Sequence, residues 1–462
     1  MGTMTPRSGL RASRAALTLL VSAALWGASG CAGSRPSASA SAVPRLGKAR
    51  MIMIENNYAA GNRAFSRSDW QGASEAFSRL YAANPKDDVA VYLSAAAWAR
   101  AGKLEGALEW LQRLWQTGSC LTPSAKSFAA IEKDLRFKDA DAIIRAEAAK
   151  EHRAAVAFTV SERDLVPESI AYDPVEKVFY VSSLWKRKIV RVKPGGPGAP
   201  AVTTDFVEEG ADELDAVHGM KVDAVRRRLW AVSAVAPEMK GFKPENYGRS
   251  ALHEYDLVSK KLVRKITFPG PLTHLFNDLV LDAAGNVYVT DTESAAIHVL
   301  RAGDGELKTL VKKGLFVAPN GIAMSADGKH LYVADVAQGI FHVDPATGEV
   351  EPLDQTPGIF PAGLDGLVLH DGSIIGIMNV VSAGRVARWR VTADGMALEE
   401  GEVLECGHPS FHQPTRGVVA DGVFYFIANS QSDQIGEGEL ATEELEDIVI
   451  LRLPLSRHNR RP

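Results

Sequence analysis

The sequence predicts two folded units of different class, a short helical-repeat domain followed by an all-β six-bladed propeller. Three observations predict this. Apolar and small residues recur at helical spacing over residues 51–153, a period-two strand pattern replaces it over residues 155–455, and one hairpin layout recurs six times in that second stretch. A chain of 462 residues also exceeds the usual size of one compact core.

The N-terminal 30 residues have the composition of a signal peptide. Arg7, Arg11 and Arg14 precede an apolar run that is too short to span a bilayer but suits the core of a signal peptide. The run ends in Ala28-Ser29-Gly30-Cys31, which resembles a bacterial lipobox. We therefore expect residues 1–30 to be removed, Cys31 to be lipidated, and the protein to be anchored to a membrane of the bacterial cell envelope. The alternative is a secreted protein without a lipid anchor.

Residues 31–50 are rich in Ser, Ala, Pro and Gly and are expected to form a flexible tether. Residues 51–153 then carry a 34-residue period, in which Ala73 and Phe77 are matched by Ala107 and Leu111. This period resembles the tetratricopeptide repeat. Two repeats and a helical cap over residues 127–153 have two interpretations, a groove that binds a protein partner or a structural collar on the propeller.

The recurring hairpin consists of a polar residue, an apolar strand, a turn and a second strand. The six polar residues are Glu168, His218, Asn277, Asn320, Asp365 and Arg416. Successive members are separated by 50, 59, 43, 45 and 51 residues, and repeats of this length built from short strands are typical of propeller blades. Since they hold one position in every blade, we expect the six side chains to converge on the central channel.

The composition argues against nucleic acid as a partner and against a framework of disulfides. The formal net charge is −4 and no block of Lys and Arg is interleaved with aromatic residues, so nucleic acid is not expected as a partner. The chain has three cysteines. With Cys31 lipidated, Cys120 and Cys406 remain in different domains, and no disulfide is expected.

Four of the six channel positions carry oxygen ligands. Carboxylate and amide oxygens are hard donors, and we expect Glu168, Asn277, Asn320 and Asp365 to bind one divalent cation. The expected ion is Ca²⁺, with Mg²⁺, Mn²⁺ and Zn²⁺ as alternatives. A cation in this position would polarise a carbonyl or phosphoryl oxygen. The alternative is an ion that only ties the blades together.

A family resemblance rests on the residues around these positions. Pro167-Glu168-Ser169, Phe276-Asn277-Asp278, Pro319-Asn320-Gly321 and Leu364-Asp365-Gly366 resemble the metal-binding turns of the senescence marker protein/regucalcin/gluconolactonase family. The resemblance covers roughly residues 160–430 and implies a catalytic metal. It also implies that Asp365 acts as general base or nucleophile, and a metal-bound carboxylate is expected to have a lowered pKa.

The remaining two channel residues, His218 and Arg416, each have two possible roles. His218 resembles the active-site histidine of the paraoxonases, where it would act as a general base, and the alternative is an imidazole that only lines the channel. Arg416 would bind an anionic group of a substrate or would neutralise Asp365 and Glu168. Both alternatives are kept for each residue.

One departure from the family pattern concerns the substrate. Sugar-lactone members carry an arginine two residues before the asparagine of blade three, where this chain has Leu275. Phe276, Phe360 and Phe411 are expected near the channel mouth. We therefore expect a lactone or ester less polar than a sugar lactone.

The sequence leaves two functions open. The first is an envelope-anchored, metal-dependent hydrolase of lactones or esters, with Asp365 and His218 as catalytic residues and Arg416 as a substrate-binding residue. The second is a non-catalytic envelope lipoprotein scaffold with a structural ion, whose helical repeats and propeller bind partners.

Overall fold

The structure is a computed structural model that describes residues 45–148, 152–195, 200–268, 273–312, 314–379, 384–399, 401–436 and 438–455. The expected signal peptide, Cys31 and most of the expected tether lie outside the described residues. Among the described residues, no helix is both long enough and apolar enough to cross a membrane.

Helices form the N-terminal part of the described chain. They are α1 (Lys48–Ser66), α2 (Trp70–Ala83), α3 (Asp88–Arg100), α4 (Leu104–Gln116), α5 (Ala125–Phe128) and α6 (Leu135–Ala148). The side chain of Asp69 accepts a hydrogen bond from Gly72 N at the start of α2, and Asp87 does the same for Ala90 N in α3, so both helices have an N-cap. Helix α4 begins 34 residues after α2, in agreement with the period read from the sequence.

Strands dominate the rest of the described residues, and most of them form six four-stranded antiparallel sheets. Blade one contains β2 (Ile170–Asp173), β3 (Val178–Ser182), β4 (Ile189–Lys193) and β5 (Val202–Val207), and blade two contains β6 (Ala216–Asp223), β7 (Arg228–Ala234), β8 (Ser250–Asp256) and β9 (Leu262–Thr267). Blade three contains β10 (Phe276–Leu281), β11 (Val287–Asp291), β12 (Ala296–Leu300) and β13 (Lys308–Val311), and blade four contains β14 (Pro319–Met324), β15 (Leu331–Asp335), β16 (Gly339–Val343) and β17 (Val350–Pro352).

Blade five contains β19 (Leu364–His370), β20 (Ser373–Met378), β21 (Arg385–Arg390) and β23 (Glu402–Cys406). Two further two-stranded pairs lie outside the blades, β18 (Asp354–Gln355) with β22 (Ala397–Leu398), and β26 (Ile435–Gly436) with β27 (Glu439–Leu440).

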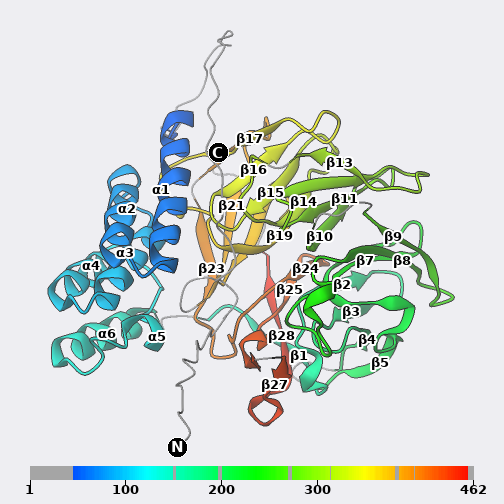
Figure 1. Cartoon of the computed structure of the whole chain (residues 1–462), viewed down its shortest axis with the longest axis horizontal. Coiled ribbons are helices and arrows are strands. Elements are labelled where there is room, and N and C mark those ends of the chain that lie inside the picture. The colour runs from blue at the N-terminus through cyan, green and yellow to red at the C-terminus, as the bar shows by residue number, and fades with distance from the viewer. Residues whose placement is uncertain are drawn as a thin grey trace, which may run out of the picture.

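Blade six closes the ring. It joins β24 (Gly417–Ala420), β25 (Val423–Ile427) and β28 (Ile448–Pro454) from the C-terminal end to β1 (Ala155–Val160), which comes from the start of the strand region. The two ends of the propeller therefore pair in one sheet, and β1 and β28 lie side by side in Figure 1. The expected fold class, helices followed by a six-bladed propeller, is confirmed.

The helices pack against one side of the propeller, next to blades four and five (Figure 1). One hydrophobic core contains residues from the helices and from these blades. Tyr58 of α1 stacks on Phe360 at 5.0 Å between ring centres, and Asn84 Nδ2 donates to Gly358 O at 2.7 Å. Tyr58 lies in α1 and Asn84 directly follows α2, so the propeller covers the side of the helical unit that contains these two residues.

A disulfide corrects one expectation from the sequence. Cys120 and Cys406 are bonded, with Cα atoms 6.2 Å apart, although they are separated by 286 residues. A buried ion pair lies in the same interface, where Arg385 Nη1 contacts Asp88 Oδ2 at 2.7 Å. Cys120 follows α4 and Cys406 ends β23, and the packing of the helices against blade five brings the two residues together.

Candidate functional site

The six predicted residues lie at or next to the innermost strand of their blades, the position that faces the channel. In four blades the ladder shifts register at that residue: the shifts fall at Val217/Gly219, Phe276/Leu279, Pro319/Ile322 and Leu364/Leu367. Such bulges re-aim a side chain out of the sheet pattern. Glu168 and Arg416 lie just before β2 and β24 and do not need a bulge.

Small residues after the bulged position let neighbouring blades approach each other. A Cβ on Gly219 would lie 2.7 Å from Asn277 O, and a Cβ on Gly321 would lie 2.8 Å from Asp365 O. No side chain fits at such distances. The glycines therefore explain how the channel-facing residues of successive blades come close enough to share one site.

The structure brings the side chains of four of the other five residues to the guanidinium of Arg416. Its Nη2 donates to Asn320 Oδ1 at 2.7 Å and to Asn277 Oδ1 at a shorter distance. The same nitrogen lies 3.7 Å from Asp365 Oδ1 and 3.9 Å from Glu168 Oε1. One cationic nitrogen thus occupies the point toward which the four predicted ligand oxygens are directed.

The other end of the guanidinium is held by backbone. Nη1 of Arg416 donates to His218 O at 3.1 Å and to Asn277 O at 2.7 Å. The side chain of Arg416 is 3% exposed, so the cation is fully inside the channel wall. Of the two roles left open by the sequence, these contacts favour neutralisation of Asp365 and Glu168.

Partners behind the ring orient two of its oxygens. Asn277 Nδ2 donates to Thr292 Oγ1 at 3.0 Å, which turns its Oδ1 toward the channel. Asn379 Nδ2 donates to Asp365 Oδ2 at 2.8 Å and to Pro414 O at 3.0 Å, which leaves Asp365 Oδ1 facing Arg416. Outer partners of this kind fix the orientation of ligand side chains in metal sites.

Burial is the largest influence on the pKa values of Glu168 and Asp365. The pKa of Glu168 lies well above its usual value because of burial and the nearby charge of Asp365, although Arg416 acts in the opposite direction. The pKa of Asp365 is also raised by burial, against the effects of Arg416 and Asn379. The lowered pKa expected for Asp365 presupposes a bound cation, and the protein residues alone give the opposite direction.

His218 is a buried neutral imidazole. Burial, with a contribution from the charge of Arg416, lowers its pKa to about 3. Its Nε2 is buried and has no hydrogen-bond partner among the described residues. An imidazole with this pKa is neutral at pH 7 but is a weak base, so the geometry favours a hydrogen-bonding role over proton abstraction.

Asp278 belongs to the site although the sequence did not single it out. It occupies the position after Asn277, and its side chain is 1% exposed. Its Oδ1 lies 3.4 Å from Arg416 Nη1 and 3.6 Å from Lys221 Nζ. The signal was present in the sequence, because the equivalent position is glycine in blades two, four, five and six.

The oxygen ligands suit a hard divalent cation, but the guanidinium of Arg416 lies at the position that the cation would occupy. Glu168, Asp365 and Asp278 supply three carboxylates against the single guanidinium of Arg416 and the more distant Lys221. Apart from Asn277 Oδ1, the ligand oxygens lie 2.7–3.9 Å from Nη2, which is farther out than the 2.3–2.6 Å typical of Ca²⁺. The residues therefore fit a cation by chemistry, provided that the guanidinium leaves and the oxygens close in.

The expected aromatic mouth is wrong for two of its three residues. Phe276 and Phe360 are both fully buried, the first in the core between blades two and three and the second under α1. Phe411 packs on Phe426. These aromatic residues fill the cores of the propeller and its interface with the helices, which the period-two pattern does not predict.

No known protein family matches the chain, and no curated protein sequence matches it. Solved structures with a similar fold include the PQQ-bound aldose sugar dehydrogenase of Streptomyces coelicolor, at 15% identity and TM-score 0.43, covering 65% of this chain and 98% of that one. A putative glucose dehydrogenase of Thermus thermophilus is 15% identical with TM-score 0.45 and covers 66% and 100%. A luciferin-regenerating enzyme is 13% identical with TM-score 0.43 and covers 65% and 95%.

Proposed function

We propose that the channel ring is the active site of a divalent-metal-dependent hydrolase of lactones or esters. The observation that carries the proposal is the convergence of Glu168 Oε1, Asn277 Oδ1, Asn320 Oδ1 and Asp365 Oδ1 on one cationic point. Oriented oxygen ligands of this type suit Ca²⁺, and also Mg²⁺ or Mn²⁺. A bound cation would supply polarisation of the substrate carbonyl and stabilisation of the charge that develops on its oxygen.

The accessibility of the ring supports this assignment. Glu168 and Asp365 have side chains that are 14% and 10% exposed, whereas Arg416 is 3% exposed. The two carboxylates are thus more open to a small molecule in the channel than the guanidinium of Arg416 is. Asp365 would act on the carbonyl carbon, directly or through a water molecule, with its Oδ2 held by Asn379.

His218 would contribute a hydrogen bond rather than a proton transfer. Its Nε2, which has no hydrogen-bond partner in the part of the chain that the structure describes, would bond to a polar group of the substrate or to a water molecule. Leu275, in place of a guanidinium that could hold sugar hydroxyls, supports an ester or lactone less polar than a sugar lactone. Arg416 would hold the ring together until a cation enters, and would then be free to bind an anionic group of the substrate.

A second candidate function is a non-catalytic scaffold. The specific observation in its favour is that Arg416 already satisfies Asn277 and Asn320 with hydrogen bonds and lies near both carboxylates. A ring completed in this way would tie blades three, four, five and six together without an ion. On this alternative the outward surface of the helices would be the place where a partner binds.

Attachment to the bacterial envelope is part of the proposal. It is supported by the basic and apolar pattern of residues 1–30 and by Cys31. The Cys120–Cys406 disulfide supports a compartment outside the cytoplasm, because disulfides persist in oxidising environments. Metabolic labelling with a fatty acid, compared between the wild type and Cys31→Ala, tests the anchor.

The catalytic proposal is tested by turnover of aryl esters, lactones and phosphotriesters, with Ca²⁺ and with a chelator. We expect ester or lactone hydrolysis that is lost with the chelator and lost in Asp365→Ala. Asp433→Ala is the matched control, because that carboxylate lies in an exposed pair with His412. Folded protein that turns over none of these substrates in the presence of Ca²⁺ would leave the scaffold as the account of the ring.

A further inference from the structure

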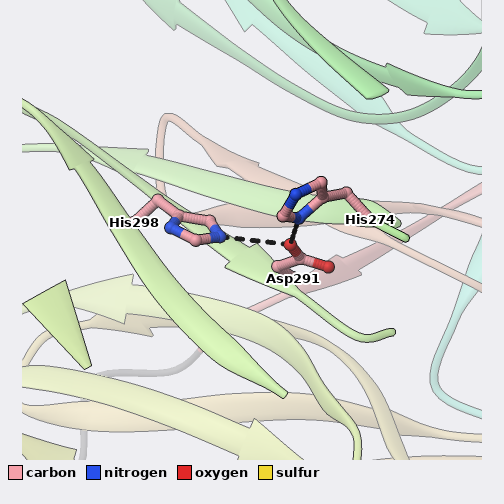
Figure 2. A group of neighbouring side chains, drawn as sticks. All are labelled: His274, Asp291 and His298. Carbon is pink, nitrogen blue, oxygen red and sulfur yellow. Dashed lines mark hydrogen bonds and ion pairs between the residues drawn. The ribbon is translucent and has the colours of Figure 1, made fainter. Parts of the chain in front are cut away.

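A second cluster of metal-ligating side chains lies inside blade three, separate from the channel ring. His274, Asp291 and His298 each offer one donor atom, and these atoms lie within 4.8 Å of one another. Figure 2 shows both imidazoles directed at the same carboxylate oxygen. His274 Nδ1 lies 2.5 Å and His298 Nε2 lies 3.1 Å from Asp291 Oδ2.

The cluster is closed off from solvent. The three side chains are between 0% and 5% exposed. Phe268 packs on the imidazoles, with its ring centre 5.0 Å from His274 and 4.3 Å from His298. Two imidazoles and a carboxylate in an apolar enclosure are therefore held at one point by the surrounding core.

Other hydrogen bonds orient the cluster so that Asp291 Oδ2, His274 Nδ1 and His298 Nε2 face one another. Asp291 Oδ1 accepts hydrogen bonds from Leu275 N at 2.9 Å and Ser294 N at 3.2 Å, so Oδ2 is the oxygen left for the histidines. His298 Nδ1 lies 3.4 Å from Thr309 Oγ1, which fixes the ring from behind. His274 Nε2 is buried without a hydrogen-bond partner among the described residues.

Blade four provides an internal comparison. Asp335 holds the position of Asp291, since each ends the second strand of its blade, and accepts hydrogen bonds from four backbone N–H groups of Val317, Ala318, Ala337 and Gln338. In the shared register, Val317 and Phe341 stand where blade three has His274 and His298. An aspartate at this position is thus satisfied without any imidazole, and the histidine pair is an addition specific to blade three.

We propose that His274 Nδ1, Asp291 Oδ2 and His298 Nε2 bind a zinc ion inside blade three. Nitrogen and carboxylate ligands are those that zinc takes in proteins, whereas Ca²⁺ takes oxygen ligands. With bonds of about 2.0–2.2 Å, tetrahedral zinc ligands lie about 3.3 Å apart. The 3.1 Å pair already matches, and the 2.5 Å pair requires a small outward movement of His274. A water molecule would complete the coordination.

The site is independent of the function of the channel, because it shares no residue with the ring and takes a different class of metal. A histidine pair in blade four gives the control. His330 Nδ1 lies 2.9 Å from His342 Nε2, but no carboxylate is described between them, and blade three has Val299 where blade four has His342.

Zinc titration of the purified full-length protein tests the proposal, with excess Ca²⁺ present to saturate any oxygen site. We expect about one equivalent of zinc to remain bound to the wild type and to His342→Val after gel filtration, by elemental analysis. His298→Phe and His274→Val, which introduce the residues found in blade four, should weaken zinc binding by at least about 100-fold. Equal zinc retention by the wild type and these two variants would overturn the proposal.

If the variants do not fold, Co²⁺ binding to the wild type tests the zinc site without them. Co²⁺ added to the wild type should give the intense visible absorption of a tetrahedral nitrogen–oxygen site, and zinc should remove it. Absence of both zinc retention and this absorption in the wild type would mean that the three side chains form only a hydrogen-bonded cluster.

Discussion

Nη2 of Arg416 lies 2.7 Å from Oδ1 of Asn320, at the point faced by the carboxylates of Glu168 and Asp365. A side chain from blade six therefore stands among oxygens contributed by blades one, three, four and five. Any divalent cation that binds these oxygens has to displace a guanidinium that already makes four hydrogen bonds to the ring. Competition between Arg416 and a metal is the main physical property of this channel.

Asn379 gives a test of the orientation of Asp365. Its Nδ2 bridges Asp365 Oδ2 and Pro414 O, so Asn379→Ala should free the carboxylate to rotate. Loss of such an outer partner typically weakens metal binding by about 10–100-fold, and we expect a decrease of this size in Ca²⁺ affinity. Isothermal titration of the folded variant checks it, and an unchanged affinity would remove Asn379 from the account.

The ion pair between Asp88 and Arg385 should be sensitive to the loss of one partner. The side chain of Arg385 is 0% exposed, and its two terminal nitrogens contact Asp88 at 2.7 and 3.1 Å. Asp88→Ala leaves this guanidinium buried and unpaired, which should lower the free energy of unfolding by about 3–5 kcal/mol. Urea denaturation measures the change.

The double variant Asp88→Leu/Arg385→Met is the control for that experiment. It removes both charges together, so most of the loss seen in Asp88→Ala should be recovered. A single variant as stable as the wild type would show that the helical unit does not depend on this contact with blade five.

The disulfide between Cys120 and Cys406 predicts the thiol content and the stability. Denatured, unreduced protein should show no reactive thiol from these two residues. Cys406→Ser should lower the free energy of unfolding by about 2–5 kcal/mol, since the bond closes a long loop in the unfolded chain. Two reactive thiols in the unreduced protein would contradict the bond.

His253 predicts a loss of stability in acid. The residue is buried in blade two, and burial together with the charge of Lys265 lowers its pKa to about 4. The unfolded state, with a histidine pKa near 6.5, binds the proton first, so stability is complete above about pH 6.5 and falls as the pH drops toward 4. A shift of this size corresponds to about 3 kcal/mol.

His253→Phe should therefore flatten the dependence of the free energy of unfolding on pH between about 6.5 and 4. His370→Phe, the same replacement at a partly exposed position of β19, is the matched control for the change of side chain. If the two variants show the same slope as the wild type, burial of His253 is not a source of acid sensitivity.

Local patterns were sufficient for the architecture. The polar residue at the start of each inner strand recurs once per blade, so its register in the sequence predicts the six blades. The arrangement at the centre of the ring could not be predicted in the same way. Arg416 has a long side chain, and whether it reaches Asn277 and Asn320 depends on the width of the channel. The spacing of the blades in the sequence does not give that width.

Contacts between distant segments account for the other differences. Cys120 meets Cys406, and Phe360 meets Tyr58, only because the helices dock on blades four and five. Nothing in the period of either segment specifies that docking. The histidine pair around Asp291 was similarly hidden, because His274 and His298 lie on different strands and meet through the register of blade three.

Calcium titration of the wild type and Arg416→Gln, by isothermal calorimetry, tests the central claim most directly. The account predicts that the wild type binds one Ca²⁺ and that the variant binds it at least about tenfold more tightly, because no guanidinium opposes the ion. If neither protein binds Ca²⁺, the ring is not a metal site and the guanidinium of Arg416 is its permanent cation.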